Sequence, residues 1–307
     1  MRLQVTRPLR SALAALLAGL LLALPTAPLV GHVERASASS VARAAERRPD
    51  VARHPKILVI AHRGFSAVAP ENTLPAMTAA ARAHADMVEL DVQRTLDRQL
   101  IVVHDTTFAR TTDIASVFPG RANDPVGSFT LSEVKQLDAG CWKGTRYAGT
   151  RAPTLDELLT TMGPTSTNLL LELKNPALYP GYEGQVAAAL ASHGFVAPGR
   201  VYVHSFSRSS LEAFHRVAPS VPLGLLTMGS LRSGRVDSWL HTVNPTTGSV
   251  TDAAVDRASA ANLQVFTWPL TVSQGSPSQV ERMVDDGVSG LITDDPALVA
   301  RLVSSTS

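Results

Sequence analysis

Short apolar runs alternate with helical stretches along most of this chain. From residue 57 onward the apolar runs are nearly uninterrupted, and amphipathic stretches lie between them. Uninterrupted apolar strands are typical of a parallel sheet buried under helices. We predict strands at 57–61, 87–92, 100–103, 169–173, 201–203, 223–227, 241–243, 264–268 and 290–293. We predict helices at 73–85, 183–193, 209–217, 252–261 and 277–286.

The number of these strand–helix units favours an α/β barrel. About eight units in ~250 residues fit a TIM (β/α)8 barrel better than an open doubly wound sheet. No Gly-x-Gly-x-x-Gly motif follows a predicted strand, which weakens a dinucleotide-binding alternative. Residues 106–151 break the alternation, and their only predicted helix is 131–137, with Ser132 placed to start it. We therefore predict a small insertion over one end of the barrel.

The first 55 residues differ in kind from the rest. Basic residues precede an uncharged, Ala- and Leu-rich run at 11–31, and the small residues Ala36-Ser37-Ala38 follow it. This pattern predicts a secretory signal peptide at 1–38, a polar linker at 39–55, and a barrel domain at 56–304. An uncleaved membrane anchor is the alternative, because the run is long enough to cross a bilayer. Two prolines near its end favour cleavage, so we expect a secreted protein.

Removal of the signal peptide would change the charge balance. The chain has 28 basic and 26 acidic residues, and cleavage after Ala38 would remove four arginines and one glutamate, leaving 24 and 25. The mature protein therefore shows no global attraction to nucleic acid, and nothing implies a stable protein partner. A single cysteine, Cys141, excludes an intramolecular disulfide, and we interpret it as a small buried apolar residue.

Three carboxylates lie near the ends of predicted strands. Residues i and i+2 of a strand point to the same side, so Glu89 and Asp91 project together, and Glu172 is on another strand. Three carboxylates with water make a site for Ca²⁺ or Mg²⁺. The alternative is that these acids form ion pairs with Arg63 and Lys174. We favour the metal, because three buried acids are costly without compensation.

Two histidines, His62 and His104, each end an apolar run. On separate strands beside an acidic cluster, they suit an acid and a base that titrate near neutrality. Arg63 offers a fork matched to phosphate oxygens, and Lys174 offers a second positive charge. This combination indicates hydrolysis of a phosphodiester.

Other polar residues near strand ends have structural interpretations. His204 and His241 lack charged neighbours in the sequence, so we interpret both as structural. Asn72 is a candidate cap for the helix that Thr73 opens, and Glu71 is a candidate brace for the site.

Short motifs follow one another in a defined order along the chain. They are His62-Arg63-Gly64, Pro70-Glu71-Asn72-Thr73, 86–92, Val102-Val103-His104-Asp105, Arg110-Thr111-Thr112, 153–159, Leu171-Glu172-Leu173-Lys174 and 290–296. Single pieces such as His-Arg-Gly are weak signals, but their order along the chain is specific. In this order the motifs resemble the glycerophosphodiester phosphodiesterase family over residues 56–304.

The resemblance implies a TIM barrel with a small insertion and a small-molecule glycerophosphodiester substrate. It implies one divalent cation, Ca²⁺ or Mg²⁺, and an acid/base pair of histidines. The implied ligands are Glu89, Asp91 and Glu172, the implied acid and base are His62 and His104, Arg63 would hold the phosphate, and Lys174 and Trp268 would line the site.

One segment departs from the family pattern. Where the family usually has Trp-Thr-Val-Asn, this chain has Phe266-Thr267-Trp268-Pro269-Leu270, so we expect a different alcohol pocket. Two alternative functions remain: a phospholipase D-type enzyme acting on choline phospholipids, and a catalytically inactive cell-surface binding module. Glu172-Leu173-Lys174 and the terminal Thr-Asp-Asp-Pro fit the first family better.

Overall fold

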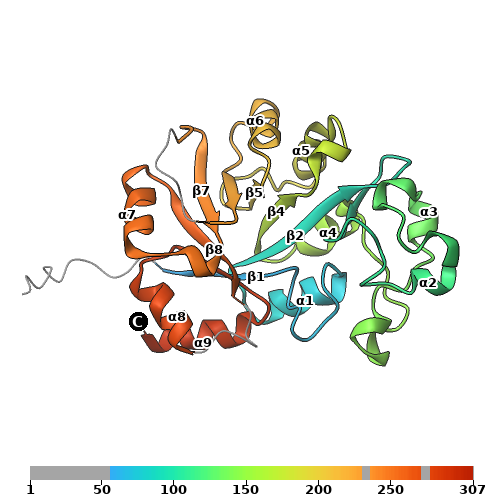
Figure 1. Cartoon of the computed structure of the whole chain (residues 1–307), viewed down its shortest axis with the longest axis horizontal. Coiled ribbons are helices and arrows are strands. Elements are labelled where there is room, and N and C mark those ends of the chain that lie inside the picture. The colour runs from blue at the N-terminus through green and yellow to red at the C-terminus, as the bar shows by residue number, and fades with distance from the viewer. Residues whose placement is uncertain (1–55, 230–235, 271–276, 307) are drawn as a thin grey trace, which may run out of the picture. The chain divides into compact units, whose positions relative to one another are not determined.

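Eight parallel strands close into a barrel. The computed structural model describes residues 56–229, 236–270 and 277–306. Around the barrel the strand order is β1-β9-β8-β7-β6-β5-β4-β2, and β2 pairs with β1 to complete the ring. This is the predicted TIM barrel (Figure 1). The strands are β1 Leu58–Ala61, β2 Met87–Arg94, β4 Asn168–Leu173, β5 Val201–Ser205, β6 Leu223–Thr227, β7 Leu240–Pro245, β8 Gln264–Leu270 and β9 Gly290–Thr293.

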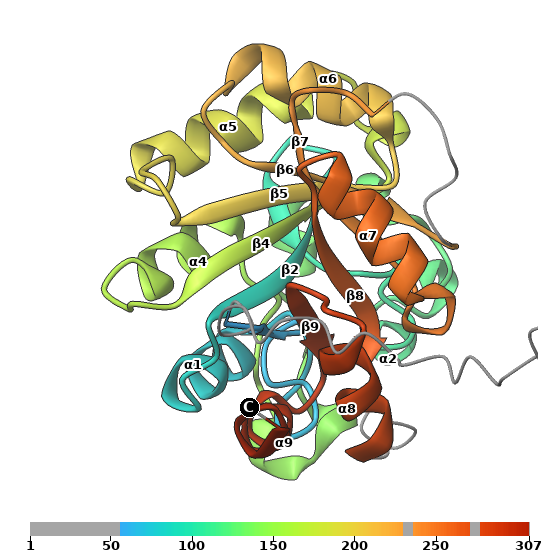
Figure 2. The same cartoon turned by 90° about the vertical axis from the view of Figure 1, so that its left-hand side faces the viewer.

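Helices cover the outside of the strands (Figure 2). They are α1 Leu74–Arg82, α4 Leu155–Met162, α5 Tyr182–Ser192, α6 Arg208–Val217, α7 Asp252–Ala260, α8 Pro277–Asp285 and α9 Pro296–Thr306. The sequence pattern missed α4 and α9. Helix α4 begins with a capping box, since Thr154 accepts from the Glu157 amide and Glu157 bonds back to the Thr154 amide. No described helix is long and apolar enough to cross a membrane.

The barrel contains two distinct apolar regions. The larger one lies between strands and helices and includes Val88, Leu90 and Leu171. The smaller one fills the barrel interior with Ile60, Met87, Leu170, Phe266 and Ile292. Alternate strand residues face opposite sides of the barrel wall. Toward the carboxyl ends of the strands, the residues that continue the inner face are polar, and they include Glu89, Glu172 and His204. The inner apolar cluster is therefore the floor beneath them.

The insertion at 106–151 has an apolar core of its own. Phe108, Phe129 and Leu137 are among its fully buried residues, and the structure contains the short helices α2 Ile114–Val117 and α3 Leu131–Val134. These lie at the end toward which β2 points (Figure 1). Strand β3, Leu100–Val102, leads into the insertion and pairs antiparallel with β2, so it is not a barrel strand.

Three details of the insertion differ from the predictions. The helix is shorter than 131–137, and its cap is Thr130 rather than Ser132. Thr130 is the N-cap because its hydroxyl accepts a hydrogen bond from the Glu133 amide, and the Glu133 carboxylate accepts one from the Thr130 amide. The prediction of a buried Cys141 was also wrong, since this residue is exposed. The predicted signal peptide at 1–38 and linker at 39–55 lie outside the described residues.

Candidate active site

One cavity at the carboxyl ends of the strands collects most of the predicted site residues. Its volume, including the part that is open to solvent, is about 420 Å³. Of the eight residues predicted to form the site, seven line it, and Asp91 lies buried behind its wall. The lining residues are His62, Arg63, Glu89, His104, Glu172, Lys174, His204, Phe206, Leu226, Trp268 and Ile292.

Each of the two predicted catalytic histidines is bound by a carboxylate. His62 Nδ1 donates to Asp294 Oδ1 at 2.7 Å, and His104 Nδ1 donates to Asp105 Oδ1 at 2.6 Å. A carboxylate on Nδ1 fixes the tautomer and leaves Nε2 to act on a ligand. The two imidazoles are therefore oriented as a matched pair.

The two carboxylates stay ionised at neutral pH. Burial opposes ionisation of Asp105, but hydrogen bonds from Arg110 and His104 outweigh it and lower its pKa to about 2. Burial also opposes ionisation of Asp294, and its hydrogen bond with His62 lowers the pKa nonetheless. The sequence pattern alone did not indicate a role for either aspartate. Asp105 was detectable as the neighbour of His104, whereas the pairing with Asp294 depends on barrel closure.

Arg110, from the insertion, connects the His104 side of the site with the Arg63 side. Its guanidinium donates to Asp105 at 2.6 and 3.0 Å and to Glu71 at 2.7 Å through two nitrogens. Glu71 also accepts from Arg63 at 2.8 Å. Glu71 thus braces the site as the sequence suggested, and the insertion contributes directly to it.

We predict that Arg110→Gln lowers kcat/KM by about 10²-fold, because both His104 and Arg63 lose an indirect support. The fall should appear in kcat through His104 and in KM through Arg63. Steady-state kinetics with thermal melting of each variant tests this. Arg121→Gln is the matched control, since Arg121 bonds Asp124 and Glu133 within the insertion. Full activity in Arg110→Gln, or an equal loss in the control, would contradict the connection.

The loop after β1 adopts unusual backbone conformations. Arg63 and Gly64 have φ of 55° and 84°, and the Arg63 amide donates to Glu89 Oε2 at 2.8 Å. A Cβ on Gly64 would lie 2.7 Å from the Ala76 backbone, so only glycine fits. This explains the Gly of His-Arg-Gly and places Arg63 against the acidic cluster.

Asn72 does not cap helix α1, contrary to the prediction. The N-cap position belongs to Thr73, and the Asn72 side chain instead binds Asp91. Asn72 Nδ2 donates to Asp91 Oδ2 at 2.8 Å, and the Asp91 amide donates to Asn72 Oδ1 at 3.2 Å. With φ of 56°, Asn72 adopts the left-handed conformation that asparagine tolerates. Its role is to position a buried carboxylate.

The three predicted metal ligands are buried together with two cationic side chains. In the strand register Asp91 pairs with Glu172. Lys174 Nζ lies 3.1 Å from Glu172 Oε1 and 3.5 Å from Asp91 Oδ1, and Arg63 Nε lies 3.6 Å from Asp91 Oδ2. Three carboxylates face two cations, so the cluster carries a surplus negative charge when all are ionised.

The pKa values of Glu172 and Asp91 are shifted in opposite directions. Burial and the neighbouring Asp91 raise the pKa of Glu172 well above its usual range. Burial opposes ionisation of Asp91 too, but Lys174 and Arg63 lower its pKa. An added divalent cation would relieve the repulsion at Glu172. The donor set therefore fits a metal ion.

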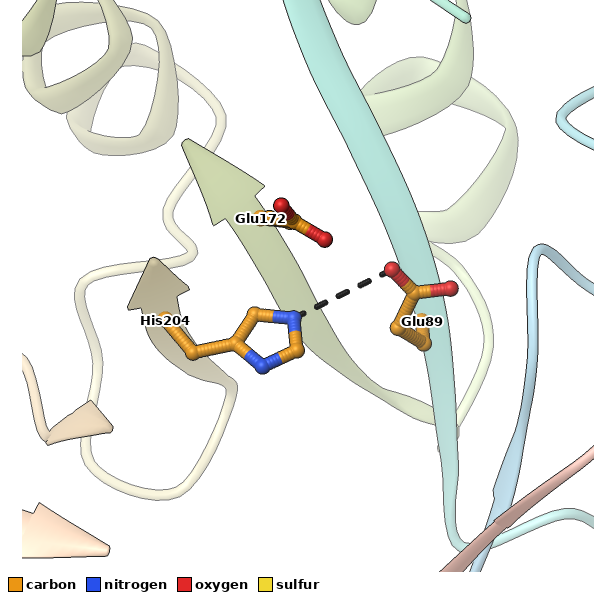
Figure 3. A group of neighbouring side chains, drawn as sticks. All are labelled: Glu89, Glu172 and His204. Carbon is orange, nitrogen blue, oxygen red and sulfur yellow. Dashed lines mark ion pairs between the residues drawn. The ribbon is translucent and has the colours of Figure 1, made fainter. Parts of the chain in front are cut away.

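A group of three side chains has ligand atoms close enough to share a metal. Glu89, Glu172 and His204 each offer an atom, and these atoms lie within 4.8 Å of one another (Figure 3). The sequence interpretation of His204 as structural accounts for one ring nitrogen only. His204 Nδ1 contacts Asn244, whereas the buried Nε2 has no hydrogen-bond partner in the part of the chain that the structure describes.

Aromatic side chains form another part of the cavity wall. Trp268 donates from Nε1 to the Asn244 carbonyl at 2.7 Å and meets Phe206 edge to face at a centroid distance of 5.5 Å. The register of β8 against β9 shifts between Thr267 and Leu270. This shift coincides with Pro269, which has no amide proton for the ladder. The segment that departs from the expected sequence pattern thus coincides with an irregular stretch of β8 next to Trp268.

This barrel, with its paired histidines, arginine and buried carboxylates at the strand ends, is an enzyme suited to phosphate esters. Residues 62–298 match the glycerophosphoryl diester phosphodiesterase family. The chain belongs to that family and is a phosphoric diester hydrolase.

Two relatives and a solved structure match this chain over most of their own lengths. A glycerophosphodiester phosphodiesterase from Caldanaerobacter subterraneus is 36% identical, with 81% of this chain and 98% of the relative covered. A Bacillus subtilis enzyme of the same name is 32% identical over 79% and 85%. The Oleispira antarctica phosphodiesterase, solved with its product sn-glycerol-3-phosphate, has a TM-score of 0.68, 25% identity and coverage of 80% and 96%. These likenesses confirm the predicted family and fold.

Proposed function

We propose that this enzyme hydrolyses glycerophosphodiesters to glycerol phosphate and an alcohol. The observation that carries the proposal is a single cavity in which two carboxylate-bound histidines accompany Arg63 and Lys174. Substrates named for its relatives, and the product bound in the Oleispira antarctica enzyme, support glycerol phosphate as the recognised group.

A divalent cation is part of the proposed site, held by Glu89, Asp91 and Glu172. When bound, it would neutralise negative charge on the phosphoryl oxygens. The surplus negative charge of the buried acids and the raised pKa of Glu172 support this assignment. Arg63 would hold a second phosphoryl oxygen through its guanidinium fork, and Lys174 would add positive charge beside it.

His62 and His104 would divide the proton transfers. One neutral imidazole takes the proton from the nucleophile through Nε2 as the new P–O bond forms. The nucleophile is water, or a neighbouring glycerol hydroxyl that would give a transient cyclic phosphate. In the second case water would then attack the cyclic phosphate and break its ring P–O bond to give glycerol phosphate. The other, protonated histidine gives its Nε2 proton to the departing alcohol oxygen as the old P–O bond breaks. Asp294 and Asp105 would stabilise the charged imidazoles.

We also propose that the protein is exported after removal of residues 1–38, with its activity outside the cytoplasm. The sequence pattern of this segment supports the proposal. Amino-terminal sequencing of protein from the culture medium tests it. A first residue near position 39 is expected, and retention of residues 1–38 on membranes would indicate an anchor instead.

A product assay tests the activity. Purified protein is incubated with glycerophosphocholine, glycerophosphoethanolamine, glycerophosphoglycerol and sphingomyelin, with chelator or with each divalent ion. We expect glycerol phosphate from the first three substrates, only when a divalent ion is present. Cleavage of sphingomyelin alone would indicate the phospholipase D-type alternative, and no cleavage of any substrate would indicate a binding module.

A further inference from the structure

His204 occupies the next position in the row of acidic side chains. In the strand register Glu172 pairs with Asp91 on one side and with His204 on the other. His204 Nε2 points toward Glu89, at 3.8 Å from Glu89 Oε1 (Figure 3). An imidazole nitrogen therefore faces the carboxylates across one end of the barrel.

Among the described residues, this nitrogen has no hydrogen-bond partner. His204 is 2% exposed, and its Nε2 is a buried polar atom without a hydrogen bond. The separation of 3.8 Å from Glu89 is too long for a hydrogen bond. Buried polar atoms without partners are rare because burial removes their contacts with water. A ligand placed between His204 and the carboxylates would satisfy Nε2.

The opposite side of the ring is held in place. Asn244 Nδ2 lies 3.0 Å from His204 Nδ1, and Asn244 Oδ1 accepts from the Thr242 hydroxyl at 2.8 Å. Gly224 is on β6, in register with His204 on β5 and Thr242 on β7, and a Cβ there would come within 2.3 Å of Thr242 Oγ1. Rotating the Asn244 amide by a half-turn exchanges its Oδ1 and Nδ2 and keeps both contacts. Asn244 Oδ1 then accepts from His204 Nδ1–H, and the lone pair of His204 Nε2 is free to bind a ligand. Such support is typical of metal-binding histidines.

We propose that His204 is a nitrogen ligand of the divalent cation, together with Glu89 and Glu172. This inference rests on the metal dependence in the proposed function and adds to its oxygen ligands. Ca²⁺ and Mg²⁺ prefer oxygen ligands, whereas imidazole favours transition ions. The site should therefore bind Co²⁺ more tightly than Ca²⁺.

Metal titration of the purified full-length protein tests the proposal. Metal-stripped wild type, His204→Gln and His241→Gln are titrated with Co²⁺ and with Ca²⁺ by calorimetry, and visible absorption of bound Co²⁺ is recorded. His241→Gln is the matched control, because His241 lies on β7, two strands away from His204, and contacts the Trp239 carbonyl. We expect His204→Gln to weaken Co²⁺ binding by about 10-fold or more and to change its spectrum, with little effect on Ca²⁺.

A measurement on the wild type alone removes dependence on the folding of a variant. Pulsed EPR of the Mn²⁺-loaded protein should show hyperfine coupling to a directly bound ¹⁴N. Absence of this coupling, or unchanged Co²⁺ affinity and spectrum in folded His204→Gln, overturns the role of His204 and leaves the oxygen-ligand site intact. Failure of wild type to bind any of these ions overturns both this inference and the metal dependence of the proposed function.

Discussion

Replacing His62 or His104 by alanine should lower kcat by about 10²–10⁴-fold, the range attributed to general acid–base catalysis. Each imidazole has Nδ1 committed to an aspartate and lines the cavity, so no neighbouring group replaces its Nε2. The fold should survive, because both side chains lie at the cavity surface rather than in the apolar core. Steady-state kinetics and circular dichroism measure the two effects.

A substrate with a good leaving group separates the two roles. A glycerophosphodiester of p-nitrophenol needs little protonation of its leaving oxygen, so it should restore activity to the variant that lacks the acid but not to the one that lacks the base. His193→Ala is the control, since His193 caps helix α5 outside the cavity. Near-normal turnover of an ordinary alkyl diester by either active-site variant would contradict the acid/base assignment.

Replacing Glu172 by glutamine should have opposite effects on activity and on metal-free stability. Activity should fall by at least about 10²-fold, because the cation loses a ligand and the phosphoryl charge loses its stabilisation. Without metal, the free energy of unfolding should rise by about 1 kcal/mol or more. The gain has a direct cause: burial and Asp91 both disfavour a charge on Glu172, and Asp91 still pairs with Lys174.

Urea unfolding with chelator and with saturating metal tests this prediction. Metal should reverse the order, because binding to the folded state stabilises only a protein that retains the site. Glu212→Gln is the control, since Glu212 is exposed and pairs with Arg216 on helix α6. A metal-free Glu172→Gln protein that is less stable than wild type would mean that Glu172 serves mainly as an ion-pair partner of Lys174.

The sequence was most informative where function follows strand ends. Parallel strands of a barrel bring their carboxyl ends to one face, so His62, Glu89 and Glu172 could be placed together without knowledge of the register. His104 reaches the same face for another reason, because it follows β3, which runs antiparallel to β2 and returns toward Asp91. The pairing of His204 with Glu172 could not, because it depends on how far β5 is shifted along β4.

Hydrogen bonds between site residues from distant segments also could not be predicted from the sequence pattern. Arg110 reaches both Glu71 and Asp105 only because the insertion folds back over the barrel. Asparagine is a common helix-capping residue, so its position just before helix α1 suggested a cap. The local sequence cannot reveal that the Asn72 side chain binds Asp91 instead. Tertiary contacts decided each of these positions.

The bond between His62 and Asp294 spans the seam where the barrel closes. His62 follows β1 and Asp294 follows β9, and the two residues are 232 positions apart. A ribosome must therefore synthesise nearly the whole chain before this histidine can acquire its carboxylate. The active centre is coupled to completion of the polypeptide, so a nascent or truncated chain that ends before β9 lacks one of the two oriented imidazoles.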